Sequence, residues 1–425
     1  MAQAVSAVAW RTPLLSCEAL SADAGCRVWF KPENLQRTGS YKVRGAFAKI
    51  QRLPERVRVR GVITASAGNH AQGVALAARR AGIPAVVVMA VNAPIAKVAA
   101  TRQLGADVIL HGDSFEDAEA EARRLARERR LTFIHPFDDW DVIAGQASVA
   151  LEVLADFPAA SGGQGLDALV VPVGGGGLIA GTALACRAWA PAGQAPVRVY
   201  GVQAQGADAA VRSLQAGHAV EIRQPRTIAD GIRVGRPGDR PLRVLKECVQ
   251  RIVAVPDDEI ARAVVYLLER VKLLVEPAGA AGVAALLSGA LRFGPEEHVC
   301  VVLSGGNVDI NVVARIIEHG LTRAGRYLVI RTRLEDRPGQ LAALLRPIAE
   351  MRVNVLDIEH HRAGWLVPVD QSDVLLHLET RDAAHAREIV DVLRRAGYPV
   401  EPLTPLDEMA SGQPDVPSPA GSGRE

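Results

Sequence analysis

Short apolar runs alternate with longer stretches of helical period through most of the chain. The runs are rich in β-branched residues, whereas the stretches between them place apolar residues three and four positions apart. A strand followed by a helix, repeated in this way, is typical of a parallel sheet whose faces are covered by helices. The expected strands are 61–66, 85–89, 107–110, 132–134, 168–173 and 197–202, and the expected helices are 71–81, 94–104, 114–130, 142–157 and 178–190.

The pattern changes near residue 320. The alternation fills most of residues 1–320 and stops at a glycine-containing connector over 318–326. Residues 327–400 then follow the order strand, helix, strand, strand, helix, strand, which is typical of a ferredoxin-like module. Residues 404–425 are rich in Pro, Ser and Gly without a long apolar run, so we expect a disordered tail. The chain is therefore predicted to have an α/β domain at 1–320 and a second domain at 327–402.

Composition and charge narrow the possible functions. The chain has 425 residues, enough for two or three domains, and its net charge of +2 with 4% aromatic residues argues against a nucleic-acid partner. The longest uncharged stretch, Ala168–Cys186, contains Pro172 and the glycine run Gly174–Gly177, so we expect a buried strand, turn and helix and no membrane span. Five cysteines without C-x-x-C spacing, and a start unlike a signal peptide, indicate a cytoplasmic protein without a disulfide framework or zinc site.

Four consecutive glycines, Gly174–Gly177, lie between a predicted buried strand and a predicted helix. Backbone N–H groups at such a helix start can converge on an anion, so the segment has the form of a phosphate-binding turn. It also fits the loose dinucleotide pattern. However, the next strand ends in Gln203 and Gln205 instead of the acid that binds a ribose hydroxyl, which argues against NAD. A tight turn without a ligand is an equally simple interpretation of the glycines alone.

Lysine is rare in this chain, with six copies against 43 arginines, so each lysine deserves inspection. Lys42 follows Gly39 and Ser40, which suggest a turn and an N-cap, and is therefore expected in the first turn of a helix. A desolvated lysine at that place can form a Schiff base. Taken alone, the segment fits a surface lysine better.

Two further strand-to-helix turns carry polar side chains. Thr64–Gly73 offers the Ser66 hydroxyl, the Asn69 amide and several backbone N–H groups at the C-terminal edge of a sheet, which together can bind a carboxylate. Val301–Asp309 places Ser304 at the end of another apolar strand, with glycines that allow the backbone to approach a ligand closely. Each segment also fits a simple turn.

The chain resembles the threonine dehydratases, also called threonine ammonia-lyases, in four segments that occur in order. These segments are 40–46, 66–73, 173–181 and 304–309, with supporting segments at 11–14, 135–139, 227–232 and 275–279. The match covers about residues 10–315. The family comprises pyridoxal phosphate enzymes with the tryptophan-synthase-β type of fold. The resemblance therefore implies a two-lobed α/β catalytic domain of PLP fold type II, with a small lobe at about 49–150 inserted in the large lobe.

The resemblance also implies a role for each matching residue. Lys42 becomes the Schiff-base lysine and removes the Cα proton of the substrate. The four glycines bind the cofactor phosphate, Asn69 its ring hydroxyl and Ser304 its pyridine nitrogen. The implied cofactor-binding residues are Lys42, Tyr41, Asn69, Gly174, Gly175, Gly176, Gly177 and Ser304, and the implied substrate-binding residues are Ser66, Ala67, Gly68, Asn69 and His70.

The implied reaction is deamination of L-threonine to 2-oxobutanoate and ammonia, with L-serine giving pyruvate. Serine racemases are similar but carry a serine where this chain has Ala67, and the neutral Ser304 does not hold the pyridine nitrogen protonated as a carboxylate would. Elimination is therefore favoured over racemisation and transamination. Gln203 and Ala209 stand where related enzymes with a divalent-cation site have carboxylates, so we expect no divalent metal, and a monovalent ion stays open. A β-hydroxyaspartate or serine-preferring dehydratase, a catalytically silent amino-acid-binding regulator and an NAD oxidoreductase are the alternatives.

Three segments of the second domain, 334–343, 353–356 and 376–381, resemble the ACT family of amino-acid-sensing domains. Paired ACT domains bind an amino acid between subunits, which makes Asp336, Gly339 and Asn354 candidate effector residues and isoleucine or valine candidate effectors. The resemblance implies an allosteric enzyme of isoleucine biosynthesis, with threonine breakdown as the alternative pathway, and a homo-oligomer, with a tetramer as the family expectation. An ACT domain that only holds the oligomer together is the alternative.

Overall fold

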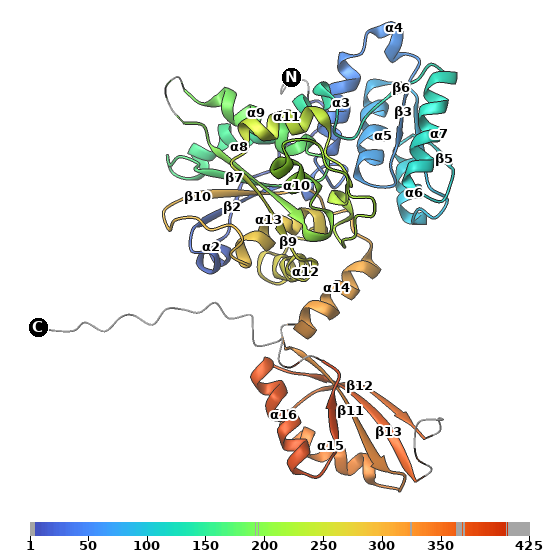
Figure 1. Ribbon diagram of the computed structural model, residues 1–425, viewed down its shortest axis with the longest axis vertical. Helices are drawn as coiled ribbons and strands as arrows, with labels where there is room; N and C mark the ends of the chain where they lie inside the picture. Colours follow the sequence, from blue (N-terminus) through green and yellow to red (C-terminus); the bar gives the residue numbers. More distant parts are fainter. Residues whose placement is uncertain are drawn as a thin grey trace, which may run out of the picture. The chain divides into compact units, whose positions relative to one another are not determined.

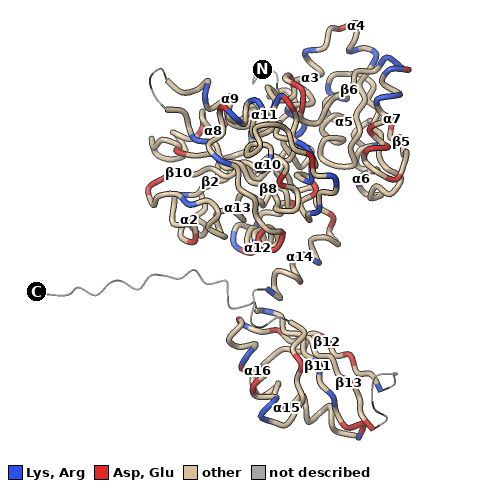
Figure 2. Tube along the Cα trace, in the orientation of Figure 1, with Lys and Arg blue, Asp and Glu red and all other residues tan. Residues whose placement is uncertain are grey.

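The computed structural model describes residues 5–404 and 406, except 192, 194, 324, 363–367 and 369 (Figure 1). The chain divides into two compact units, Met1–Asp309 and Ile310–Glu425. The first unit contains a six-stranded and a four-stranded sheet, and the second contains one four-stranded sheet. Figure 2 shows Lys and Arg interspersed with Asp and Glu along the first unit.

The six-stranded sheet of the first unit is buried on both faces. One face packs on α13 (Pro277–Leu287), which is buried along almost its whole length, and the other packs on α8 (Trp140–Ala160) and α9 (Gly177–Trp189). Burial of both faces explains why its strands are continuous apolar runs. All strands except the first run parallel, in the order β1 (Leu15–Ser16), β2 (Arg27–Pro32), β10 (His298–Leu303), β7 (Ala168–Pro172), β8 (Arg198–Ala204) and β9 (Arg251–Val255).

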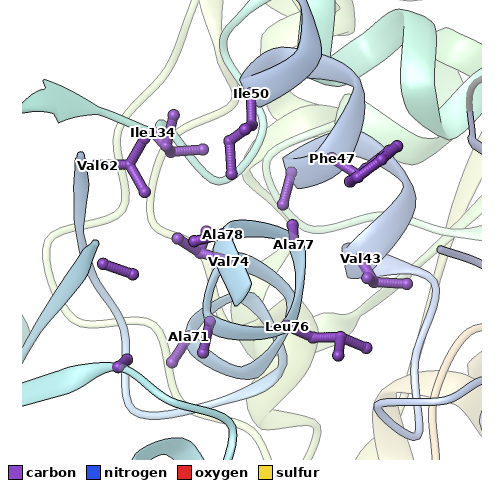
Figure 3. Close-up of a cluster of buried hydrophobic side chains, with 14 of the residues drawn as sticks. Val43, Phe47, Ile50, Val62, Ala71, Val74, Leu76, Ala77, Ala78 and Ile134 are labelled. Carbon is purple, nitrogen blue, oxygen red and sulfur yellow. The ribbon is translucent and has the colours of Figure 1, made fainter. Parts of the chain in front are cut away.

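The four-stranded sheet of the first unit is wholly parallel. Its order is β5 (Asp107–Leu110), β4 (Ala85–Met89), β3 (Val62–Ala65) and β6 (Thr132–Phe133). One face packs on α7 (Phe115–Glu128), and the other on α5 (Asn69–Ala81), which in turn packs on α3 (Lys42–Arg52). Figure 3 shows the apolar side chains of α3 and α5 that meet there, Val43 and Phe47 from α3 and Val74 and Ala77 from α5. This contact holds α3 against the smaller sheet.

Short helices complete the first unit. They are α2 (Glu18–Ala24), α4 (Glu55–Arg58), α6 (Ile95–Gln103), α10 (Ala209–Ala216), α11 (Asp239–Cys248) and α12 (Asp257–Tyr266), with 3-10 turns at Glu33–Leu35, Gln205–Ala207 and Asp230–Ile232 and a π-helical turn at Leu267–Val271. Among the described helices, α8 alone is long and apolar enough to cross a membrane. More than half of its most apolar window is buried, and it packs on α3 and α9. We therefore describe α8 as a core helix of this unit.

The second unit has the predicted order of strands and helices. Helix α14 (Ile310–Arg323) precedes an antiparallel sheet of order β12 (Val355–His361), β13 (Gln371–Glu379), β11 (Tyr327–Glu335) and β14 (Val400–Pro402). The apolar side chains of α15 (Gln340–Glu350) and α16 (Ala383–Arg395) form one core with alternate residues of β11 and β13. Of the tail predicted over 404–425, only residues 404 and 406 lie within the described part of the chain.

Three local predictions can be compared with the observed elements. The N-cap of α7 is Ser114, and its capping box with Asp117 confirms the prediction. The proposed N-cap at Ser40 is wrong, because α3 begins after Tyr41 and the buried Ser40 hydroxyl has no hydrogen-bond partner among the described residues. The connector predicted over 318–326 is also partly wrong, since α14 continues to Arg323 on a buried face of apolar residues.

Candidate active site

The predicted site segments meet where parallel strands end. The turn Ser66–Asn69 follows β3, Gly174–Gly177 follows β7, and Ser304 follows β10. The backbone N–H of Tyr41 donates to the carbonyl of Ser304 at 3.2 Å, which brings the start of α3 to the end of β10. Because ligands of open parallel sheets bind beyond the carboxyl ends of their strands, this arrangement marks the candidate site.

Lys42 is the first residue of α3, and its side chain is half-buried. Its Nζ donates to the carbonyl of Pro136 at 3.1 Å and lies 5.3 Å from the centre of the Tyr41 ring. Burial lowers the pKa of Lys42 to about 8, although the nearby Glu276 carboxylate opposes that shift. A larger fraction of this amine is therefore neutral near pH 7 than of an ordinary lysine. A neutral amine is the form that attacks a carbonyl carbon.

The glycine turn lies directly beside the segment that contacts Lys42. A Cβ at Gly175 would lie 2.4 Å from the ring of Phe137, and one at Gly177 would lie 2.9 Å from the Phe137 Cβ. Gly176 is the N-cap of α9 and has a left-handed φ of 91°, which favours glycine. A side chain at Gly175 or Gly177 would displace Phe137, and one at Gly176 would lie 2.8 Å from the Pro241 Cβ, so only bare backbone fits here. The backbone N–H groups at the start of α9 are therefore accessible to an anion.

Asn69 lies in a chain of hydrogen bonds that the sequence analysis did not foresee. Its Nδ2 donates to Glu276 Oε1 at 2.8 Å and Oε2 at 3.1 Å, and its Oδ1 accepts from Asn307 Nδ2 at 2.8 Å. Burial raises the pKa of Glu276 to about 7, although the hydrogen bond from Asn69 opposes the shift. Both new residues belong to segments quoted above, but only their contacts reveal a role. A glutamate directly before Pro277, which opens a wholly apolar helix, is the sequence signal that could have marked Glu276.

The other predicted substrate-binding residues form the turn before α5. The Ser66 Oγ accepts from the backbone N–H of Gly68 at 3.1 Å, and a Cβ at Gly68 would meet no atom within 4 Å. Ser66, Ala67 and Gly68 are thus partly exposed beside open space. The His70 side chain is buried instead, with its Nε2 3.0 Å from the carbonyl of Ile134. Burial and the charge of Lys42 lower the pKa of His70 to about 3, which keeps the imidazole neutral.

The remaining predictions concern metal ligands and Ser304. Gln203 has a structural role, because its Oε1 accepts from the backbone N–H groups of Ala210 and Val211 and its Nε2 donates to the carbonyl of Val173. Within the described part of the chain, no group of three or more His, Cys, Asp or Glu is placed to hold a metal ion. Ser304 is 4% exposed at the end of β10.

The structure does not bring the three candidate effector residues together within one chain. Asp336 and Gly339 precede α15, whereas Asn354 follows it, and the helix of 11 residues separates them by about 16 Å. Asn354 is exposed and donates to Glu379 at 2.9 Å, and Asp336 accepts from Arg362 at 3.1 Å. One effector molecule cannot contact both groups in one copy of this unit.

Comparison with protein families decides what the first unit is. Residues 5–305 match the family described as "Pyridoxal-phosphate dependent enzyme". The chain belongs to this family. Residues 328–395 match the ACT domain. The predicted family, the α/β fold with its ACT domain, and the predicted cofactor, pyridoxal phosphate, are thereby confirmed.

Individual relatives of this pyridoxal-phosphate dependent enzyme cover from about three quarters to nearly all of the chain. It is 45% identical to an "L-threonine ammonia-lyase" of Thermotoga maritima over 92% of this chain and 95% of that protein. It is 42% identical to an "L-threo-3-hydroxyaspartate ammonia-lyase" of Pseudomonas sp over 75% of this chain and 96% of that protein. A solved threonine deaminase of T.th. has a TM-score of 0.67 and 41% identity, covering 72% of this chain and 96% of that one.

The residues present fit the cofactor of this pyridoxal-phosphate dependent enzyme. Gly174–Gly177 leave no room for a Cβ at the start of α9, where the phosphate would lie. Lys42 would bond to the aldehyde carbon of pyridoxal phosphate. The Asn69 amide and the Ser304 hydroxyl would hydrogen-bond to the hydroxyl group and the nitrogen of its ring. Alanine at Gly177 is expected to weaken cofactor binding about tenfold or more, because Phe137 must move. Equilibrium titration with pyridoxal phosphate measures this, and Gly165→Ala, which has open space, is the matched control.

The lowered pKa of Lys42 predicts how cofactor loading depends on pH. The neutral amine reacts, so the rate at which the apoprotein binds pyridoxal phosphate covalently should rise with pH and level off above about 8. At pH 7.4 about a fifth of the lysine is neutral, against less than about a thousandth at a pKa of 10.5. Stopped-flow absorbance at several pH values tests this. A rate that is still rising steeply at pH 9.5 would contradict the lowered pKa.

Proposed function

We propose that the chain deaminates L-threonine to 2-oxobutanoate and ammonia with bound pyridoxal phosphate, and L-serine to pyruvate. The observation that carries this proposal is that the segment Pro136–Phe137 contacts both Lys42 and the glycine turn. The carbonyl of Pro136 accepts the hydrogen bond from Lys42, whereas the Phe137 ring lies against Gly175 and the Phe137 Cβ and backbone lie against Gly177. The reactive amine and the glycine turn thus lie on either side of one segment. The names of the Thermotoga maritima relative and of the solved threonine deaminase support the choice of substrate.

Lys42 and Ser66 have separate roles in this reaction. Bound pyridoxal phosphate supplies a carbonyl carbon that bonds to the amino group of the substrate and a conjugated ring that accepts the electron pair of the broken Cα–H bond. The neutral form of the Lys42 amine, which its lowered pKa makes more abundant, takes the Cα proton. The Ser66 oxygen accepts from Gly68, which leaves its O–H free to donate to the substrate carboxylate. Net loss of water from Cα and Cβ, and hydrolysis of the C–N bond by a second water, give the products.

Formation of 2-oxobutanoate from L-threonine by the cofactor-loaded protein tests the proposal. Turnover of L-threonine, with slower turnover of L-serine to pyruvate, is the expected result. A protein that binds pyridoxal phosphate but turns over neither amino acid would sink the substrate assignment, and one that stays colourless with the cofactor would favour the silent amino-acid-binding regulator.

A second candidate is deamination of β-hydroxyaspartate, which the name of the Pseudomonas relative supports. The substrate then carries a second carboxylate at Cβ, so it needs a cationic or hydrogen-bonding partner there. Comparing kcat/KM for L-threonine with that for L-threo-3-hydroxyaspartate separates the two candidates. The ratio should favour threonine if the main proposal is right, and a ratio reversed by tenfold or more would replace it.

We also propose that the unit at 327–402 regulates the catalytic domain at 1–320, whose small lobe spans about 49–150. Asp336 and Gly339 lie far from Asn354 in one chain, so a pocket lined by all three needs a second copy, which supports a homo-oligomer such as a tetramer. Isoleucine or valine is the proposed effector, acting allosterically within isoleucine biosynthesis. All five cysteines are unpaired, which supports a cytoplasmic location.

Replacing Asn354 with alanine is expected to raise the effector concentration for half-maximal response about tenfold, because one hydrogen bond to the effector is lost. Turnover without effector should stay within about twofold of the unmodified protein. Isoleucine and valine titrations of the initial rate measure both quantities. Glu379→Gln, which changes the partner of Asn354 but keeps an acceptor, is the control. Identical titration curves for Asn354→Ala and the unmodified protein would remove Asn354 from the effector site.

A further inference from the structure

The orientation of the Asn69 amide is fixed by its neighbours. Asn307 Nδ2 donates to the carbonyl of Thr38 at 2.6 Å and to Asn69 Oδ1 at 2.8 Å. Since an amide nitrogen only donates, the atom of Asn69 that faces Asn307 must be its oxygen. The Nδ2 of Asn69 therefore faces Glu276, and Glu276 must accept from it in either protonation state. Glu276 Oε1 at 2.8 Å and Oε2 at 3.1 Å belong to one carboxyl group on one side of this nitrogen, so one N–H of Asn69 points to that group and the second N–H is left for another acceptor.

Glu276 is held as firmly as Asn69. The residue is 7% exposed and its backbone N–H donates to the carbonyl of Gly305 at 3.0 Å. A Cβ at Gly305 would lie 2.6 Å from Glu276 Oε1 and 3.1 Å from Asn69 Nδ2. The absence of a side chain at Gly305 therefore leaves the space that the Glu276 and Asn69 side chains occupy. The charged groups that act on Glu276 come from three other elements, namely Lys42 on α3, Lys97 on α6 and Asp230 in a 3-10 turn. A carboxyl group so enclosed has few alternative positions.

We propose that Glu276 is a positioning residue, which acts through Asn69 by directing the second amide N–H of Asn69 to the ring oxygen of pyridoxal phosphate. The inference rests on the proposed function, in which Asn69 binds that oxygen. Without Glu276 the Asn69 side chain keeps only the hydrogen bond from Asn307 and can turn about its last torsion. The N–H would then be offered in several directions, and cofactor affinity would fall although Asn69 itself is present.

A double-mutant cycle on cofactor affinity tests this role. Glu276→Ala is expected to raise the Kd of the apoprotein for pyridoxal phosphate about tenfold, while Glu276→Gln, whose amide oxygen still accepts from Asn69, stays within about threefold of the unmodified chain. In the Asn69→Ala background, Glu276→Ala should add less than about twofold, because its effect passes through Asn69. The absorbance of the lysine-bound cofactor gives Kd without any turnover, and circular dichroism of each apoprotein checks its fold.

The outcomes separate this inference from the proposed function. Additive effects of the two alanine substitutions, or a Glu276→Gln variant as weak as Glu276→Ala, would overturn the positioning role and leave the reaction untouched. If Glu276→Ala does not fold, Glu276→Leu, which also removes the acceptor, takes its place in the cycle: equal losses with and without Asn69→Ala contradict the role. An unmodified chain that fails to bind pyridoxal phosphate would instead overturn the proposed function, and this inference with it.

Discussion

Alanine in place of Lys42 is expected to lower kcat for L-threonine by about 10⁴-fold or more, since the Cα proton loses its acceptor and the cofactor its covalent attachment. The hydrogen bond to Pro136 is the only one that this amine makes in the described part of the chain, so the fold should tolerate the change. Turnover and the absorbance of the lysine-bound cofactor should disappear together. Initial rates and the visible spectrum of the loaded protein are the measurements.

Two further variants sharpen the Lys42 experiment. Lys42→Arg keeps the positive charge but does not lose its proton near neutral pH, so it should be as inactive as the alanine variant. Lys49→Ala removes a lysine from the same helix that only pairs with Asp139 and Asp141, and it should retain turnover. Retained turnover by Lys42→Ala would remove this lysine from its proposed role. Equal loss in Lys49→Ala would show that α3, and not the Lys42 amine, is what the substitution disturbs.

The sequence predicts features that repeat locally. Apolar residues recur at a different spacing in strands than in helices, so neighbouring residues alone predict the alternating elements of the first unit. They also predict that Gly174–Gly177 lie in a turn between a strand and a helix. Even here boundaries shift: α5 begins at Asn69, two residues before the predicted start at 71. The Ser40 error has a similar origin, because a serine before a helix is a good N-cap only if its hydroxyl faces the first turn.

Long-range contacts account for what the sequence could not predict. Asn69 and Glu276 are 207 residues apart, and the carbonyl that accepts from Lys42 lies 94 residues away. Neither the raised pKa of Glu276 nor the lowered pKa of Lys42 follows from local sequence, because both depend on burial by distant elements. The resemblance to a known family supplied the role of Lys42, whereas Glu276 needed the folded chain.

The largest expected effect on stability comes from Arg44, two residues after Lys42. Its guanidinium is fully buried and bonds both carboxylate oxygens of Glu33 at 2.8 Å and both oxygens of Glu152 at 2.6 and 2.9 Å. The buried Lys31 Nζ completes this cluster at 2.6 Å from Glu152. These charges join α3 to β2 and α8, so they fix the start of the helix that carries Lys42.

Arg44→Ala is expected to lower the free energy of unfolding by about 3–5 kcal/mol, because Glu33 would remain buried without its main counter-charge. Burial opposes ionisation of Glu33, but the charge and hydrogen bonds of Arg44 outweigh it and lower the pKa of Glu33. Without Arg44 the carboxyl group must stay charged in a dry site or take up a proton. Urea unfolding of the full chain measures the loss. Arg52→Ala, which breaks an exposed pair with Asp141, should cost less than about 1 kcal/mol. Similar losses in the two variants would mean that water reaches the cluster, and that its charges do not fix α3.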